Sequence, residues 1–153
     1  MGRTVITFGT FDVFHVGHLR VLERARELGD RLVVGVSADA LNFSKKGRVP
    51  VFSQEERSAI VGGLKVVDET FIEESLEQKR EYIERYAADV LVMGDDWAGK
   101  FDDLGDICKV VYLTRTPSVS TTALIEKIST AGSAATSAAG RRSGTGSRPV
   151  RSP

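Results

Sequence analysis

The chain has 153 residues, 41% of them hydrophobic, which suits one domain with a substantial core and leaves no room for a second large one. Its 21 basic and 21 acidic side chains give a net charge of zero, but residues 129–153 contain only four charged residues, all arginines. Residues 1–128 therefore have 17 basic and 21 acidic side chains and a net charge of −4. A negative charge argues against a broad nucleic-acid-binding surface. One cysteine excludes an internal disulfide, no run of about 18 apolar residues could span a membrane, and no signal segment precedes the first strand, so we expect a cytoplasmic protein with no nucleic-acid or membrane partner.

The first predicted strand, Thr4–Phe8, leads through a turn into a helix predicted from about Gly17 to Leu28. In the turn, Gly9-Thr10-Phe11-Asp12, the glycine lets backbone N–H groups approach a ligand closely. His15 and His18, the two histidines of the chain, lie where the helix begins. Because a helix N-terminus presents free N–H groups and the positive end of the helix dipole, this pair favours a ligand that carries phosphate.

Two other interpretations of the histidine pair need weighing. Structural zinc requires four nitrogen or sulfur ligands, and the chain offers no third histidine and only Cys108 as a thiol, which makes zinc binding unfavourable. A purely structural role for the pair, taken without its surroundings, stays open at this point because short motifs also occur by chance.

The second strand is predicted at Leu32–Ser37 and is followed by a basic loop that contains Lys45, Lys46 and Arg48. Such charges usually only solvate a surface, but a position just past a strand end favours contact of some of them with phosphate. Ser53-Gln54-Glu55-Glu56 then resembles a capping box and predicts the start of the next helix.

The rest of the domain repeats this alternation of strands and helices. Further strands are predicted at Val67–Ile72, Val90–Met93 and Val110–Leu113, with helices near Leu76–Tyr86 and Thr121–Ile128. The strands are almost continuously apolar, as in sheets that are covered on both faces. The sequence therefore predicts an α/β fold: a Rossmann-like, doubly wound, parallel five-stranded sheet with flanking helices, whose ligands bind beyond the carboxyl ends of the strands.

Two more polar segments follow predicted strands. The paired carboxylates of Met93-Gly94-Asp95-Asp96-Trp97 suit Mg²⁺ or sugar hydroxyls, or simply cap the following turn. The segment Arg115-Thr116-Pro117-Ser118-Val119-Ser120-Thr121-Thr122 combines an arginine, which grips phosphate with two N–H groups, with hydroxyls at the start of a helix. Two phosphate-binding segments are thus expected at one edge of the sheet.

The composition changes at Ser129. Residues 129–153 consist almost entirely of Ser, Thr, Ala, Gly, Pro and Arg, and such a segment buries too little apolar surface to offset its loss of conformational entropy. We expect a folded domain over residues 1–128 and a disordered tail over residues 129–153.

The motifs together resemble the cytidylyltransferase family. They are Gly9-Thr10-Phe11-Asp12 with His15-Val16-Gly17-His18, the segment from Met93 to Asp102, and Arg115-Thr116 followed by Ser120-Thr121-Thr122. Many nucleotidyltransferases and class I aminoacyl-tRNA synthetases share His-x-Gly-His alone, whereas the three motifs in this order are far more specific. The likeness covers Val5 to about Ile128 and is greatest to the members that act on glycerol 3-phosphate.

The resemblance implies a nucleotidyltransferase that moves CMP from CTP to sn-glycerol 3-phosphate and gives CDP-glycerol and pyrophosphate. It also implies a homodimer, and the chemistry leads us to expect Mg²⁺ with the CTP phosphates. Another acceptor, such as a sugar phosphate, a polyol phosphate or phosphoethanolamine, or ATP in place of CTP, stays open. So does a nucleotide-binding module without turnover.

The resemblance also implies residue roles. His15, His18 and Arg115 are expected to be catalytic, with both histidines donating hydrogen bonds to the triphosphate. A donor or protonated imidazole suits that role, so bound phosphate should raise the histidine pKa. The residues expected to bind CTP are Gly9, Thr10, Phe11, Asp12, Gly94, Asp95, Asp96, Trp97, Thr116, Ser120 and Thr121. Lys45, Lys46 and Lys79 are expected to hold the acceptor phosphate, and no metal ligand is assigned.

Overall fold

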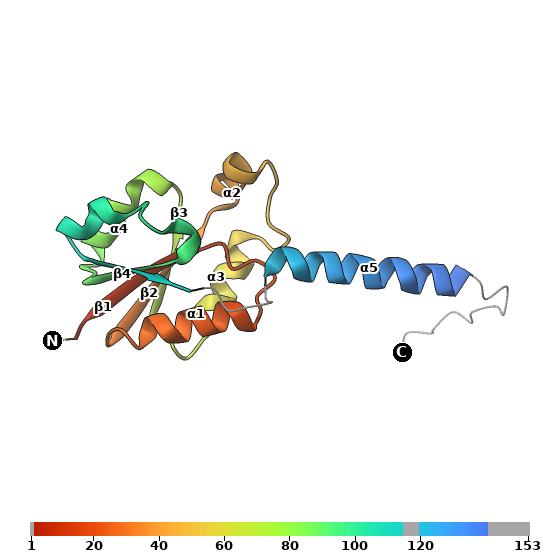
Figure 1. Ribbon diagram of the computed structural model, residues 1–153, viewed down its shortest axis with the longest axis horizontal. Helices are drawn as coiled ribbons and strands as arrows, with labels where there is room; N and C mark the ends of the chain where they lie inside the picture. Colours follow the sequence, from red (N-terminus) through yellow and green to blue (C-terminus); the bar gives the residue numbers. More distant parts are fainter. Residues whose placement is uncertain (1, 115–119, 141–153) are drawn as a thin grey trace, which may run out of the picture. The chain divides into compact units, whose positions relative to one another are not determined.

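The computed structural model of the chain describes residues 2–114 and 120–140 (Figure 1). The chain divides into two compact units, residues 1–121 and residues 122–153, which are described separately. Among the described residues, no helix is long and apolar enough to cross a membrane.

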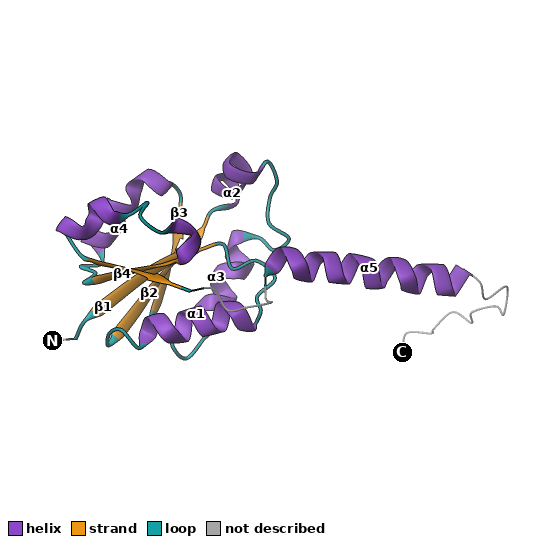
Figure 2. Ribbon diagram, viewed as in Figure 1, coloured by secondary structure: helices purple, strands orange, loops and turns teal. Residues whose placement is uncertain are grey.

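The first unit is built on five parallel strands in the order β3-β2-β1-β4-β5 (Figure 2). The strands are β1 (Thr4–Gly9), β2 (Arg31–Ser37), β3 (Glu69–Glu73), β4 (Val90–Gly94) and β5 (Lys109–Leu113). The predicted fold and all five predicted strands are confirmed, with ends that shift by at most two residues. Because the strand order reverses next to β1, the carboxyl ends of β1 and β4 mark the place where such sheets bind ligands.

Both faces of the sheet are covered, because successive residues of a strand point to opposite sides. On one face Val5 packs with Leu22 of α1 (Val16–Arg26) and with Val61 of α3 (Gln54–Gly62). On the other face Ile6 packs with Ile83 of α4 (Lys79–Arg85). Figure 2 shows α1 and α4 on opposite sides of the strands. This two-sided burial explains the continuous apolar character of the strands.

A helix that the sequence did not predict, α2 (Asp39–Lys46), follows β2. The basic loop expected here is therefore wrong in part, since Lys45 and Lys46 lie in the last turn of α2. No side chain caps the start of this helix at Ala38, so the usual sequence signal is missing. Gly47 ends the helix with a φ of 71°, a left-handed conformation that glycine adopts without strain.

The predicted helix near residues 76–86 consists of two parts, a short 3-10 turn η1 (Leu76–Gln78) and then α4. Two further 3-10 segments, η2 (Asp95–Trp97) and η3 (Asp102–Asp106), follow β4. The chain thus makes tight turns, rather than long helices, after β3 and β4 near the carboxyl edge of the sheet.

The last helix, α5 (Thr121–Gly140), runs well beyond the predicted Ile128. It differs from the disordered tail expected from Ser129, and the alanines of residues 131–139 give a physical reason, since alanine has the highest helix propensity. Residues 141–153 lie outside the described residues, so the domain boundary at residue 128 stays a prediction.

One buried arginine joins the loops at the carboxyl edge. Arg57 of α3 is 1% exposed, and its guanidinium donates to the carbonyls of Phe52 (3.0 Å) and Thr10 (2.8 Å) and to the carboxylate of Asp39 (2.7 Å). Arg57 therefore fixes the turn after β1 and the start of α2 relative to α3. The sequence does not predict this role of Arg57, because a helical pattern does not show that a loop will fold over the residue.

Candidate active site

Part of the predicted site lies at the carboxyl edge of the sheet, around a cavity of about 370 Å³, whereas His15 and His18 are not among the residues that line this cavity. It lies among the end of β1, the end of α2, the turn between β3 and α4, and the 3-10 segment after β4. Its walls are formed by Phe8, Gly9, Thr10, Ser37, Lys46, Glu73, Leu76, Lys79, Met93, Asp96, Trp97 and Lys100. The cavity brings together six of the predicted site residues, from segments far apart in the sequence.

The histidine pair forms the N-terminal cap of α1. His15 Nδ1 accepts a hydrogen bond from the backbone N–H of Gly17 at 3.0 Å, and His18 Nδ1 accepts one from the N–H of His15 at 3.2 Å. The rings stack with their centroids 3.8 Å apart. This reciprocal arrangement is that of a capping box, with imidazole nitrogens in place of the usual hydroxyl and carboxylate.

The cap also decides which ring nitrogen carries the proton. Because each Nδ1 accepts a hydrogen bond, the proton of a neutral ring is assigned to Nε2. The contacts of Thr121 support this assignment for His18. The Thr121 hydroxyl donates its proton to the carbonyl of Asp12 at 2.9 Å, so its oxygen can accept a hydrogen bond from His18 Nε2, which lies 3.5 Å away. Both imidazoles are thus held as Nε2–H donors at a helix N-terminus, as anion binding requires.

The neutral form is also favoured by burial. Loss of solvation, and then the neighbouring His15, lower the pKa of His18 to about 4 against the opposing effect of Asp12. Loss of solvation lowers the pKa of His15 too. Without a bound anion both histidines are therefore neutral donors at pH 7. The expected rise of their pKa on phosphate binding stays a prediction.

The turn after β1 is strained. Phe11 and Val13 have φ values of 54° and 47°, in the left-handed region that residues with a β-carbon rarely occupy. A β-carbon on Gly9 would lie 2.9 Å from the Phe11 ring, so only glycine fits here. The same ring meets His18 edge to face, with centroids 5.5 Å apart. The turn therefore supports the histidine pair as well as the predicted backbone contacts.

Asp12 is engaged by the protein itself. Its two carboxylate oxygens accept hydrogen bonds from the backbone N–H groups of Val51 (2.7 Å) and Phe52 (2.9 Å), and the residue is almost fully buried. The sequence analysis assigned Asp12 to CTP. The structure gives its side chain an anchoring role, because both oxygens hold the segment before α3 against the turn.

The helix α2 carries two of the predicted lysines in its last turn, and one of them, Lys46, reaches the cavity. The Thr10 hydroxyl donates to Asn42 Oδ1 at 2.9 Å, which fastens α2 to the turn after β1. Lys46 lines the cavity. The pKa of Lys45 is lowered, mostly by loss of solvation, with Lys46 and Lys79 adding to this effect and Glu73 opposing it. Lys45 is therefore close enough to Lys46 and Lys79 for their charges to affect its protonation.

Lys79 lies at the start of α4 and is buried in an ion pair with Glu73, at the end of β3. Burial lowers the pKa of Lys79, and the charge and hydrogen bond of Glu73 oppose this shift. The ammonium also lies 4.2 Å from the ring centroid of Phe8. The predicted acceptor lysine is thus a cation inside the protein that lines the cavity, not a solvated surface charge.

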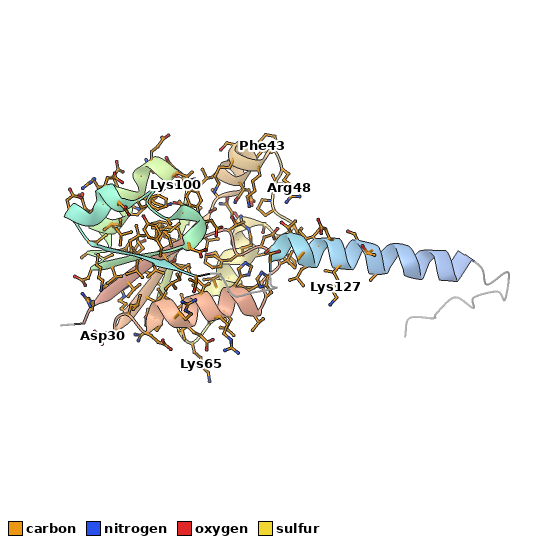
Figure 3. All side chains as sticks on the ribbon, in the orientation of Figure 1. Asp30, Phe43, Arg48, Lys65, Lys100 and Lys127 are labelled. Atoms are coloured by element: carbon orange, nitrogen blue, oxygen red, sulfur yellow. The ribbon has the colours of Figure 1, made fainter. Side chains whose placement is uncertain are left out.

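The segment after β4 supplies the opposite wall. Asp96 and Trp97 line the cavity, whereas Gly94 and Asp95 are not among its lining residues. Lys100, which is labelled in Figure 3, has its ammonium 5.3 Å from the centroid of the Trp97 ring. Trp97 in turn packs on Phe101, at 5.4 Å between centroids. The wall therefore combines an aromatic surface, a carboxylate and a cation.

The last predicted motif is described only in part. Arg115 and Thr116 lie outside the described residues, so their assignments to catalysis and to CTP stay predictions. Ser120 is partly buried, and Thr121 reaches Asp12 and His18 through its hydroxyl. The predicted meeting of this motif with the histidine pair is thus seen at Thr121.

Among the residues that the structure describes, no three His, Cys, Asp or Glu side chains gather in a way that could hold a metal ion.

Comparisons with known proteins show the family of this chain. The cytidylyltransferase-like family matches residues 6–131. The chain belongs to this family. Glycerol-3-phosphate cytidylyltransferase of Bacillus subtilis is 49% identical over 126 residues, which cover 82% of this chain and 97% of that protein. Glycerol-3-phosphate cytidylyltransferase of Staphylococcus aureus is 40% identical over 126 residues, which cover 82% and 95%.

A solved structure supports the fold of this cytidylyltransferase-like domain. A lipopolysaccharide core biosynthesis protein from Thermoplasma volcanium is 27% identical and superposes with a TM-score of 0.65, over 76% of this chain and 99% of that one.

The sequence analysis missed three residues of this cytidylyltransferase-like site: Asn42, Glu73 and Lys100. Asn42 lies in the unpredicted helix. Glu73 follows a strand in an acidic pair, Glu73-Glu74, and nothing in the pattern tells which of the two points inward. Lys100 stands inside the quoted Met93–Asp102 motif, so its position in that motif was a usable signal.

The lowered pKa of His18 makes a prediction about stability. The His18 imidazole has a pKa of about 4 in the folded protein and about 6.5 in the unfolded chain. As the pH falls from about 6.5 to about 4, the unfolded chain binds a proton at His18 that the folded protein does not bind, so the free energy of unfolding decreases. We expect this decrease between about pH 7 and 4.5 to be smaller in His18→Gln than in the wild type, as measured by urea denaturation.

Glutamine is a suitable replacement because at the third helical position it can accept the same backbone N–H without titrating. Carboxylates titrate alike in both proteins, so the difference between the two pH curves reports on position 18. Parallel curves would show that His18 is not held neutral.

Proposed function

We propose that this protein transfers CMP from CTP to sn-glycerol 3-phosphate and so makes CDP-glycerol and pyrophosphate. The observation that carries the proposal is the 49% identity to an enzyme named for this reaction, over 97% of that enzyme's length. The site supports it with two groups of anion-binding residues, the histidine pair at the start of α1 and the lysines around the cavity.

In the proposed reaction, a phosphate oxygen of glycerol 3-phosphate attacks the α-phosphorus of CTP. A new P–O bond forms, the bond from the α-phosphorus to the bridging oxygen breaks, and pyrophosphate leaves with the electron pair. Catalysis of such a transfer depends on positioning and on stabilising negative charge. His15 and His18 serve as Nε2–H donors to the triphosphate, with the helix dipole behind them.

The acceptor is proposed to enter the cavity with its phosphate toward Lys46 and Lys79, which both line it. Lys45 adds charge from the same helix turn. Trp97 and Asp96 are proposed to meet the nucleoside, and Arg115 and Thr116 to hold the triphosphate from the other side. Mg²⁺ is proposed to accompany CTP, where it neutralises phosphate charge.

We also propose a cytoplasmic homodimer. The described residues include apolar side chains that are strongly exposed, among them Phe43, Val49 and Val51 in the α2–α3 region, at 57%, 61% and 63%. Figure 3 shows Phe43 on α2. A second copy would remove such surface from water. Light scattering should then give twice the chain mass of 16.6 kDa, whereas the single mass would rule the dimer out.

The reaction is tested directly by turnover. Purified protein with CTP, Mg²⁺ and glycerol 3-phosphate should release pyrophosphate and form CDP-glycerol in equal amounts, followed by a coupled phosphate assay and mass spectrometry. A panel of ATP, GTP and UTP against ribitol phosphate, sugar phosphates and phosphoethanolamine defines the specificity. If no polyol phosphate is turned over, the proposed function is wrong.

The cap geometry allows the two roles of His15 to be separated. Asparagine is among the best N-cap residues, and its Oδ1 can accept the Gly17 N–H, but its side chain does not carry a donor as far as Nε2 does. We expect His15→Asn to retain stability and to lower kcat by about 10²-fold, the scale for one transition-state donor. His15→Ala should lose similar activity and, in addition, about 1 kcal/mol of stability.

Urea denaturation and steady-state kinetics on the same preparations check both effects. Near-normal kcat in the asparagine variant would mean that His15 only caps the helix.

A further inference from the structure

The floor of the cavity holds an ion pair that the proposed reaction does not by itself explain. Glu73 and Lys79 have only 1% and 3% of their surface exposed, yet both line the cavity. Glu73 is the last residue of β3 and Lys79 the first of α4, with the short turn η1 between them. Burial removes both charges from water at a large cost in solvation, so such a pair is poor evidence for a role in stability alone.

The surroundings of Lys79 disfavour a cation unless a counter-charge is present. Its ammonium lies 4.2 Å from the ring centroid of Phe8 and 5.2 Å from that of Phe101, and these rings replace water. Aromatic faces attract a cation, but they do not match the hydration that burial removes. The Glu73 carboxylate supplies both a hydrogen bond and the opposite charge.

Apart from the pair itself, the cavity is lined by two cations, Lys46 and Lys100, and by one carboxylate, Asp96. A further cation, Lys45, interacts electrostatically with Glu73, Lys46 and Lys79. Several cations close together favour loss of a proton from one of them, most easily from the buried one. Glu73 opposes this effect for Lys45 and Lys79 alike.

Glu73 is itself held in place. The Ser37 hydroxyl, at the end of β2, lies 3.5 Å from a Glu73 oxygen and 3.3 Å from the carbonyl of Gly9. The carboxylate is therefore connected to the turn after β1 that carries the predicted nucleotide contacts. The position of the Glu73 carboxylate is thus fixed by contacts at the edge of the sheet.

We propose that Glu73 is a positioning residue, which keeps the Lys79 ammonium charged and directed at the phosphate of the acceptor. This inference rests on the proposed function. It gives the buried pair a role in recognising the acceptor: the carboxylate maintains a cation that burial would otherwise discharge, and the incoming phosphate becomes its second counter-ion.

The test is Glu73→Gln, which keeps the shape and one hydrogen-bond acceptor and removes the charge. The matched control is Glu74→Gln, which removes the same charge from the exposed neighbouring side chain. We expect Glu73→Gln to raise KM for glycerol 3-phosphate about tenfold near pH 7.5, with KM for CTP changed less than about twofold. A merely structural defect would not divide the two substrates in this way.

The pH profile gives a second readout. Lys79 binds phosphate in its protonated form, so kcat/KM for glycerol 3-phosphate falls as the pH rises through the Lys79 pKa. Without Glu73 this alkaline limb should move to lower pH by about one unit or more, the scale of losing a close opposite charge. The acidic limb, which includes titration of the acceptor phosphate near pH 6, should not move. The Glu74→Gln profile should match the wild type.

An unmoved alkaline limb, or equal increases in both KM values, would overturn the role of Glu73. If Glu73→Gln does not fold, Glu73→Asp replaces it: the charge remains one methylene shorter, so KM for the acceptor should rise while the alkaline limb stays in place. An unchanged KM for the acceptor in that variant would also overturn the role.

The outcome is separable from the proposed function. If the wild type turns over no polyol phosphate, the proposed function fails on its own, and Glu73 is then tested by calorimetric binding of inorganic phosphate to the wild type and to Glu73→Gln. About tenfold weaker binding by the variant supports the positioning role, and equal binding contradicts it.

Discussion

The site depends on how the strained turn after β1 is held. The backbone of residues 10–13 makes no regular secondary structure, and two of its residues have positive φ, so the turn persists only because its surroundings fix it. Asp12 fixes the turn by accepting hydrogen bonds from two backbone N–H groups of the segment before α3. Arg57 fixes it by donating hydrogen bonds to the carbonyl of Thr10 and to the carboxylate of Asp39. A buried carboxylate and a buried guanidinium thus replace the missing backbone hydrogen bonds.

This arrangement determines where the chemistry-bearing side chains lie. The turn leads directly into the capped start of α1, so fixing the turn also fixes the Nε2 donors of the two histidines. The same contacts fasten α2, whose last turn carries the lysines, through Asp39 and the bond from Thr10 to Asn42. The proposed donors to the nucleotide and the proposed cations for the acceptor are therefore positioned by one network, although they come from different elements.

The sequence predicts the parts of the molecule that follow repetitive rules. Apolar strands and their connections determine the sheet, and His-x-Gly-His at a strand-to-helix junction indicates the anion site. The anchoring roles of Asp12 and Arg57 were not predictable, because a charged residue in a loop or on a helix looks alike in sequence whether solvent or another loop covers it. Helix α2 lacked a capping residue, and Glu73 and Lys79 lie in different elements, so no single helical or strand pattern relates them.

The two anion-binding groups are built on opposite electrostatic principles. The histidines can bind an anion without a charge, because the helix N-terminus bonds to each Nδ1 and leaves Nε2–H as the donor. Burial lowers the pKa of His18, so this imidazole stays neutral near pH 7. The lysines are useful only as cations, and burial works against them, so a carboxylate must stand beside Lys79. Neutral donors suit a triphosphate whose charge a metal ion partly balances, whereas a phosphate monoester dianion without such a partner needs full positive charge from the protein. The difference in the chemistry of the two groups thus matches the difference between the two proposed ligands.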